Sequence, residues 1–182
     1  MKQLTDYIFK KNIFPFNLCD EIVREYSNEN FFRRNNSIGT RNLGEINLSD
    51  YGLINKKNSY TRKKIENDIF NNIGNCIEEY VEMTQYHLPI KEDVGYSMRK
   101  MVQGDYYGTH DDQAIGIDTT KLTITIVIND EFKGGNFTFF DEEIIYEFKK
   151  GDVIMFPSNF MYPHSVQPIT EGVRYNLTTW LR

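Results

Sequence analysis

The spacing of apolar residues changes partway along the chain, and this change constrains the fold more than any other feature. Up to about residue 85, apolar side chains recur every three or four residues, which predicts helices over residues 17–28 and 59–85. Further on, β-branched and aromatic residues dominate short stretches bounded by turn residues, which is typical of strands. Helices followed by many short strands predict a mostly β sandwich or barrel with helices packed on one side. A jelly roll is the expected architecture.

Capping and turn residues set the boundaries of the expected elements. Asn17 is expected to cap the first helix, and residues 141–143, 149–152 and 169–172 are predicted turns. The polar segment 31–58 is expected to be a loop with short extended pieces. The expected strands cover residues 96–101, 122–129, 136–140, 144–148, 153–156 and 173–181.

Charge and composition argue against several classes of function. The net charge of -5 and the pI near 5.3 disfavour broad binding to a phosphate backbone, so nucleic acid is not an expected partner. Residues 1–6 lack the apolar region of a signal peptide and no apolar run could span a bilayer, so we expect a soluble, cytoplasmic protein with no membrane partner. Cys19 and Cys76 fall in the predicted helices, where we expect them to pack as small apolar residues. The sequence does not indicate an oligomeric state.

Two of the three histidines lie in the strand-rich half, each at a strand end or in a turn. Residues i and i+2 of an extended chain point to the same side, so His110 and Asp112 can converge on one ion. A second imidazole from a distant strand, with His164 as the obvious source, would complete the two-histidine, one-carboxylate set that binds non-haem iron. An isolated His-x-Asp is a weak motif, and a surface or packing role for His164 is the alternative.

The last predicted strand carries an arginine, Arg174, ten positions after His164. This arginine alternates with apolar neighbours on a strand that we expect to line the interior. Such a position requires an anion, because an unpaired charge in a barrel interior is costly. The alternative is an internal salt bridge between Arg174 and an Asp or Glu side chain.

Several segments of the second half, in their order and spacing, resemble the prolyl-4-hydroxylase-like branch of the Fe(II)/2-oxoglutarate dioxygenases. The resemblance covers about half of the chain, from Tyr96 to Arg182, and several linked motifs in one order are far more specific than any one of them. The matching segments are Tyr107–Asp112, Thr123–Asn129, Gly134–Phe137, Lys150–Phe156, Pro163–Pro168 and Gly172–Trp180.

This resemblance implies a double-stranded β-helix, the jelly-roll or cupin-like fold already expected from the strand spacing. Helices would flank it, and the site would lie in its open mouth. The length of 182 residues fits a single domain, 1–182. Within that domain, 1–95 would form a helical support region with a variable loop, and 96–182 would form the catalytic jelly-roll core.

By position, the resemblance implies that His110, Asp112 and His164 bind Fe(II). Arg174 would pair with the distal carboxylate of 2-oxoglutarate, because a planar guanidinium fork matches a planar anion. Thr178 lies on the same face of the strand and could hydrogen-bond the same group. The other end of 2-oxoglutarate would chelate the iron.

The implied activity is hydroxylation of a C–H bond with O₂ and 2-oxoglutarate, producing succinate and carbon dioxide, with ascorbate as an added reductant. A prolyl or similar residue in a protein or peptide is the expected substrate. Tyr107 and Trp180 would line the substrate side, with plain core packing as the alternative role. Three other functions stay open: hydroxylation of a free amino acid or small metabolite, a non-catalytic jelly-roll module that holds a metal, and, more weakly, a metal-dependent hydrolase.

Overall fold

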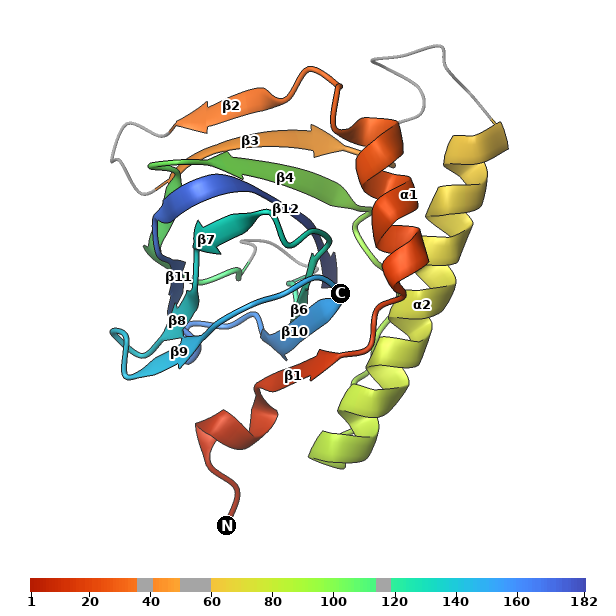
Figure 1. Cartoon of the computed structure of the whole chain (residues 1–182). Helices are drawn as coiled ribbons and strands as arrows, with labels where there is room; N and C mark the ends of the chain where they lie inside the picture. The colour runs from red at the N-terminus through yellow and green to blue at the C-terminus, as the bar shows by residue number, and fades with distance from the viewer. Residues whose placement is uncertain (36–40, 50–59, 114–118) are drawn as a thin grey trace.

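The computed structural model describes residues 1–35, 41–49, 60–113 and 119–182. It shows a strongly curled antiparallel sheet with two helices lying side by side along one side of it (Figure 1). The helices are a short 3-10 helix Leu4–Tyr7, then α1 Phe16–Tyr26 and α2 Tyr60–Thr84.

Twelve strands lie in the described part of the chain, and all their pairings are antiparallel. The expectation of a mostly β, jelly-roll-like fold with flanking helices is therefore confirmed. The strands are β1 Phe9–Asn12, β2 Phe32–Asn35, β3 Arg41–Asn47, β4 Ser97–Val102, β5 Tyr106–His110, β6 Leu122–Val127, β7 Phe132–Gly134, β8 Phe137–Phe139, β9 Ile144–Tyr146, β10 Asp152–Pro157, β11 His164–Val166 and β12 Ile169–Leu181.

The order of the strands explains how the sheet encloses an interior. Along the sheet they run β1-β10-β6-β12-β4-β3-β5-β11-β8-β9, with β2 paired to β3 and β7 paired to β12. Strand β12 therefore lies in the middle, between β6 and β4, while β11 faces the interior from the other arm of the curl (Figure 1). The first 95 residues supply β1, β2 and β3 as well as the helices, so both halves of the chain build the sheet.

Apolar side chains pack on both faces of the sheet and form two separate clusters. Along β10, Val153 and Met155 pack toward the helices, whereas Ile154 and Phe156 point into the interior of the curl. The alternation follows from the two-residue period of a strand. Both faces of the central strands are covered, so every residue of Leu122–Val127 is buried, including the polar residues Thr123 and Thr125.

Helix α1 covers the sheet with one apolar face, and its buried residues are Leu18, Cys19, Ile22 and Tyr26. The prediction that Asn17 caps this helix is wrong, because the capping residue is Pro15, whose extended backbone and fixed φ begin the helix one residue earlier than expected.

The longer helix, α2, buries Ile65, Ile69, Ile73, Cys76, Tyr80 and Thr84. Its observed bounds agree with the helix predicted over residues 59–85. Among the described residues, no helix combines the length and the apolar character needed to cross a bilayer.

Residues 169–172 are not the turn that the sequence predicts. They form the first part of β12, which pairs with β7 across an irregular register. Gly172 has a φ of +76°, so the strand bends here without breaking, and the turn-like composition reflects this local distortion. In the polar segment 31–58, the structure shows β2 and β3 as extended pieces, and residues 36–40 and 50–59 of that prediction lie outside the described residues.

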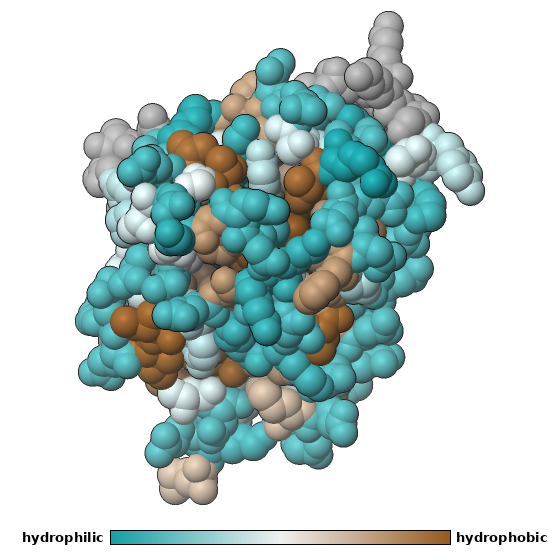
Figure 2. Space-filling model, in the orientation of Figure 1, coloured by the Kyte–Doolittle hydropathy of each residue, from teal (hydrophilic) through white to brown (hydrophobic). Residues whose placement is uncertain are grey.

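The surface contrasts with the two apolar clusters. On the face shown in Figure 2, hydrophobic residues form small separate groups among hydrophilic ones. Most large apolar side chains are thus inside the molecule, either between sheet and helices or within the curl. Buried polar side chains that could support chemistry, such as those of His164 and Arg174, lie in the interior of the curl.

Candidate active site

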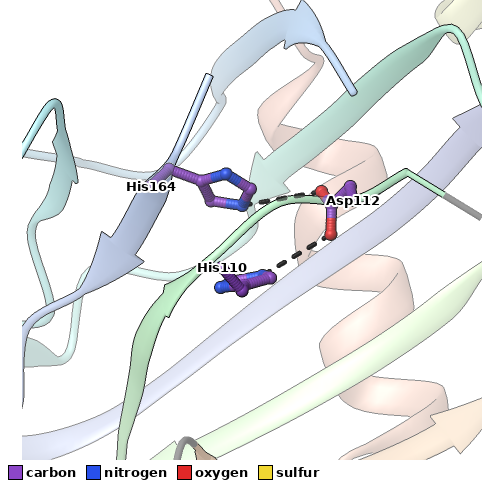
Figure 3. Close-up of side chains that lie close together, drawn as sticks. All are labelled: His110, Asp112 and His164. Atoms are coloured by element: carbon purple, nitrogen blue, oxygen red, sulfur yellow. Dashed lines mark ion pairs between the residues drawn. The ribbon is translucent and has the colours of Figure 1, made fainter. Parts of the chain in front are cut away.

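Three metal-ligating side chains converge inside the curl, from two neighbouring strands. His110 ends β5, Asp112 follows it by two residues, and His164 begins β11. The two histidines are direct partners in the register of these strands, so their side chains meet on one face. One ligand atom from each of the three residues lies within 4.8 Å of the others (Figure 3). This spacing suits ligands that surround a single ion.

Hydrogen bonds fix the orientation of both imidazole rings. Nδ1 of His110 lies 2.9 Å from the carbonyl oxygen of Gly108, and Nδ1 of His164 lies 3.1 Å from that of Tyr162. A carbonyl only accepts, so each Nδ1 carries the proton and each Nε2 keeps a lone pair. Each Nε2 points at Asp112, at 3.5 Å from Oδ1 for His110 and from Oδ2 for His164 (Figure 3). Backbone carbonyls are common partners of metal-binding histidines.

The carboxylate of Asp112 is held by neighbours on β6 and at the end of β10. The hydroxyl of Thr123 donates to Asp112 Oδ2 over 2.8 Å. Thr123 Oγ1 also lies 3.0 Å from the hydroxyl of Ser158, and the carbonyl of Ser158 accepts the backbone N–H of Asp112 over 3.1 Å. This carboxylate is therefore fixed from both its side chain and its backbone.

The protonation states of His164 and Asp112 suit metal binding at neutral pH. Burial lowers the pKa of His164 to about 4, although Asp112 partly opposes the shift. Burial alone would raise the pKa of Asp112, but His110 and His164 outweigh it and hold this pKa well below its usual range. The site thus presents a neutral imidazole and an ionised carboxylate, which are the forms that coordinate a metal.

Arg174 is fully buried in the same interior, at 0% exposure. Its Nη1 donates to the carbonyl of Gly135, while its Nε and Nη2 have no hydrogen-bond partner among the described residues. Burial lowers the pKa of Arg174 to about 9, and Arg99 adds to the decrease, so the guanidinium is still charged at neutral pH. The internal salt bridge that the sequence left open is not formed with any described carboxylate. A buried cation with two unsatisfied nitrogens is arranged to receive an anion.

The remaining predicted residues also face the interior. Thr178 is buried, and its hydroxyl lies 3.2 Å from that of Thr125. Tyr107 stacks on the ring of His110 with centroids 3.8 Å apart. Trp180 is partly buried, and its Nε1 has no partner among the described residues. The structure therefore brings both aromatic residues to the interior, where Tyr107 contacts His110, and their role on the substrate side stays a prediction.

Comparison with known proteins identifies the second half of the chain. The model of a family described as the 2OG-Fe(II) oxygenase superfamily matches residues 96–182. Residues 96–182 belong to the 2OG-Fe(II) oxygenase superfamily. The matched region contains all the strands from β4 to β12 and every residue of the candidate site. The resemblance noted in the sequence is thus confirmed.

Curated relatives of this 2OG-Fe(II) oxygenase region are PKHD-type hydroxylases. The one from Idiomarina loihiensis is 30% identical over an alignment of 97 residues, and the match covers 50% of this chain and 44% of that protein. One from a Synechococcus species is 28% identical over an alignment of 88 residues, and the match covers 43% of this chain and 38% of that protein. The chain thus spans less than half the length of the curated relatives it matches.

Solved structures of prolyl hydroxylases share the fold over nearly the whole chain. The viral collagen prolyl hydroxylase of Paramecium Bursaria Chlorella virus-1 matches with a TM-score of 0.71 at 14% identity, covering 97% of this chain and 96% of that one. A Trichoplax adhaerens prolyl hydroxylase in complex with a peptide fragment of hypoxia inducible factor matches with a TM-score of 0.71 at 15% identity, covering 97% and 84%. The fold shared with these structures therefore includes the helices and strands before residue 96.

The residues of the site fit the groups that 2OG-Fe(II) oxygenases use. His110, Asp112 and His164 provide two imidazoles and one carboxylate, the set that binds non-haem Fe(II) and leaves other positions open. Arg174 provides a buried cation with unsatisfied nitrogens for the carboxylate of 2-oxoglutarate. Both fits rest on donor atoms that the fold has already oriented.

Sequence reasoning did not single out three residues that shape this site. Thr123 and Ser158 hold Asp112, and Arg99 on β4 lies over the rings of Tyr107 and Trp180. The strand that holds Thr123 was predicted, but the contact between Thr123 and Asp112 depends on the tertiary fold. Arg99 lies two residues before Met101, so the two side chains share one face of β4. Met101 pairs with Arg174 on β12, and this spacing could have indicated that Arg99 also faces the interior.

Proposed function

We propose that this protein is an Fe(II)- and 2-oxoglutarate-dependent hydroxylase that acts on a C–H bond of a prolyl or similar residue in a protein or peptide. One observation carries the proposal: the interior holds both a two-histidine, one-carboxylate triad and the unsatisfied cation of Arg174. A metal-dependent hydrolase needs the first feature but gives no role to the second. An oxygenase that binds an acidic co-substrate beside its metal uses both.

Each residue of the candidate site has a defined role in this proposal. His110, Asp112 and His164 would hold Fe(II), which with 2-oxoglutarate and O₂ supplies the oxidising chemistry that yields succinate, carbon dioxide and a hydroxylated product. Arg174 would orient the co-substrate by its distal carboxylate, at the end of the interior away from Trp180 along β12. The apolar rings around the triad exclude water, and Phe137, Phe139 and Phe156 contact His164.

The substrate class rests on the relatives. The curated relatives are named as hydroxylases, and the solved neighbours include prolyl hydroxylases, one of them bound to a peptide. These names support hydroxylation and a peptide substrate as parts of the proposal. A free amino acid or small metabolite is the second candidate, and the cytoplasmic location expected from the sequence stays a prediction.

The test is succinate formation from 2-oxoglutarate under air with added Fe(II) and ascorbate. We expect slow turnover by the wild type without a substrate, and stimulation by proline-containing peptides. His164→Ala and Arg174→Ala should lose this turnover, the first because a metal ligand is missing and the second because the co-substrate is not held. His87→Ala, which removes an exposed histidine outside the site, is the matched control and should keep it.

Two results would decide against the proposal or narrow it. If the wild type neither binds nor consumes 2-oxoglutarate, the chain is a metal-holding module with the same fold. If turnover occurs and free proline stimulates it while peptides do not, the substrate is a small molecule and the peptide part of the proposal is wrong.

A further inference from the structure

A second arginine lies in the interior, and the roles described above do not use it. Arg99 is on β4 and is 9% exposed. It pairs in register with Glu45 on β3 and with Asn176 on β12. Arg99 and Met101 are two residues apart on the strand, and Met101 packs in the interior cluster, so Arg99 also points inward. The arginine therefore lines the interior of the curl, on the same sheet as Arg174.

Aromatic rings place the guanidinium of Arg99 near the triad. Its Cζ lies 5.6 Å from the ring centroid of Tyr107 and 5.4 Å from that of Trp180. Tyr107 in turn stacks on His110. Arg99 is thus one aromatic ring away from a metal ligand, and its charge is among the causes that lower the pKa of Asp112. Two rings that hold a guanidinium in place reduce the entropy lost when it binds a ligand.

The charge of Arg99 is only partly compensated. Its Nε lies 3.4 Å from Glu45 Oε2, and the other oxygen of Glu45 pairs with Arg34 over 3.0 Å. One carboxylate therefore serves two arginines. The terminal nitrogens of Arg99 form no hydrogen bond with any described residue, so two of its donor groups are available to a ligand.

A count of formal charges shows that 2-oxoglutarate does not neutralise the remaining positive charge at Arg99. The charges of Fe(II), Asp112, Arg174 and a doubly negative 2-oxoglutarate cancel. Both carboxylates of the co-substrate are then engaged, one at the metal and one at Arg174. The group formed by Arg99, Glu45 and Arg34 keeps one positive charge. A further anion would complete the balance.

We infer that Arg99 binds a carboxylate carried by the substrate, close to the carbon that is hydroxylated, and so selects acidic substrates. This inference rests on the proposed function and narrows its substrate class. The carboxylate could belong to a peptide C-terminus, to an Asp or Glu side chain next to the reacting residue, or to a free amino acid. All three present the same planar anion to the guanidinium fork.

Trp180 makes binding at this place directly measurable. It is the only tryptophan of the chain, and the Arg99 guanidinium lies over its ring. We would record its fluorescence without oxygen, with Mn(II) in place of Fe(II) and saturating 2-oxoglutarate, so that ligands bind without turnover. Three ligand pairs differ only in charge: proline and prolinamide, a proline peptide with a free or amidated C-terminus, and amidated Pro-Glu and Pro-Gln peptides.

In the wild type, the carboxylate member of at least one pair should bind on the order of tenfold to a hundredfold more tightly than its neutral partner. Arg99→Gln should remove this difference, and Arg99→Lys should keep part of it because the charge remains without the fork. Glu45→Gln should strengthen carboxylate binding, because it removes the competing anion from Arg99. The pair that responds identifies the source of the carboxylate.

Lys100→Gln is the matched control. Lys100 is the next residue on the same strand, but its amino group lies over the rings of Phe31 and Tyr175 on the opposite face. This variant should keep the wild-type preference. A far-ultraviolet circular dichroism spectrum and a melting curve of each variant would show whether loss of binding reflects loss of folding.

The inference is overturned if a folded Arg99→Gln variant still prefers the carboxylate members, or if no pair shows a preference in the wild type. It is also overturned if Arg99→Gln weakens 2-oxoglutarate itself and leaves the substrate preference unchanged, since Arg99 would then serve the co-substrate. Failure of the proposed function looks different, because the wild type would then show no turnover of 2-oxoglutarate.

Discussion

Nε2 of His164 lies 3.5 Å from Oδ2 of Asp112, and the imidazole is neutral although it faces a carboxylate. An imidazole beside an anion would ordinarily gain a proton, but here burial disfavours the charged ring more strongly than the carboxylate favours it. The pair is therefore ready for a metal ion without first losing a proton. This relationship should lower the free energy of unfolding of the metal-free protein at acidic pH.

The metal-free protein should lose stability as the pH falls from neutral. His164 has a pKa of about 4 in the folded state against 6.5 for the free group, so between these values the unfolded chain binds a proton that the folded chain does not. The free energy of unfolding should decrease by about 2 kcal/mol between neutral pH and about pH 4.5. Urea unfolding in the presence of a chelator measures this. His164→Gln should show a smaller decrease and His87→Gln the full one; equal slopes in all three would contradict the prediction.

Thr123→Val should weaken metal binding without unfolding the protein. The change keeps the shape of the side chain but removes the hydroxyl that donates to Asp112. Loss of such a supporting hydrogen bond typically reduces metal affinity by about 10-fold to 100-fold. Mn(II) binding followed by electron paramagnetic resonance measures the effect. Thr138→Val is the control, because its buried hydroxyl pairs with Ser165 instead. The prediction fails if both variants bind Mn(II) equally well.

Arg174→Met should make the metal-free protein more stable while weakening the binding of 2-oxoglutarate. The guanidinium is fully buried, and the described residues offer it no carboxylate, so a methionine of similar length removes an unfavourable charge. We expect a gain on the order of 1–3 kcal/mol in urea unfolding and a loss of 2-oxoglutarate binding of at least about tenfold by calorimetry with Mn(II). A variant that is less stable than the wild type would mean that Arg174 has a structural partner.

Gly135→Ala should destabilise the protein and disturb Arg174. Gly135 has a φ of +66°, and an added Cβ would collide with the side chain of Ile169 and approach Nη1 of Arg174 at 3.4 Å. The expected loss is about 1–3 kcal/mol in urea unfolding, together with weaker 2-oxoglutarate binding. Gly74→Ala, in the middle of α2 with open space around it, is the matched control and should gain up to about 1 kcal/mol. Equal effects would rule out a special role for the backbone at Gly135.

The sequence predicted the parts of the fold that local patterns encode. Helix α2 and the apolar strands β6 and β10 lie where the periodicity places them. Strand β3 has no such pattern: Arg41–Asn47 is polar and contains a glycine. It is a strand because it pairs with β4 and β5, and such pairing depends on residues far away in the chain.

The site was predictable to a similar degree. The two-residue spacing of His110 and Asp112 gives a shared face on any extended chain, and the structure places both side chains together. His164 was the obvious third ligand by residue type, but its assignment together with Arg174 to one site came from the family resemblance, because no local rule brings distant strands into one interior. Arg99 was not singled out, since the side of β4 that faces inward is known only once its register with β12 is known.

The central place of β12 also bears on how the molecule is made. This strand follows both β4 and β6 in the sequence, yet it lies between them and carries Arg174. During synthesis, β4 and β6 are made before β12, the strand that pairs with both of them. Their unpaired edges are exposed until β12 has been made. Pairings across such long stretches of chain form slowly. The interior that holds the candidate site is therefore completed only after β12 has joined β4 and β6.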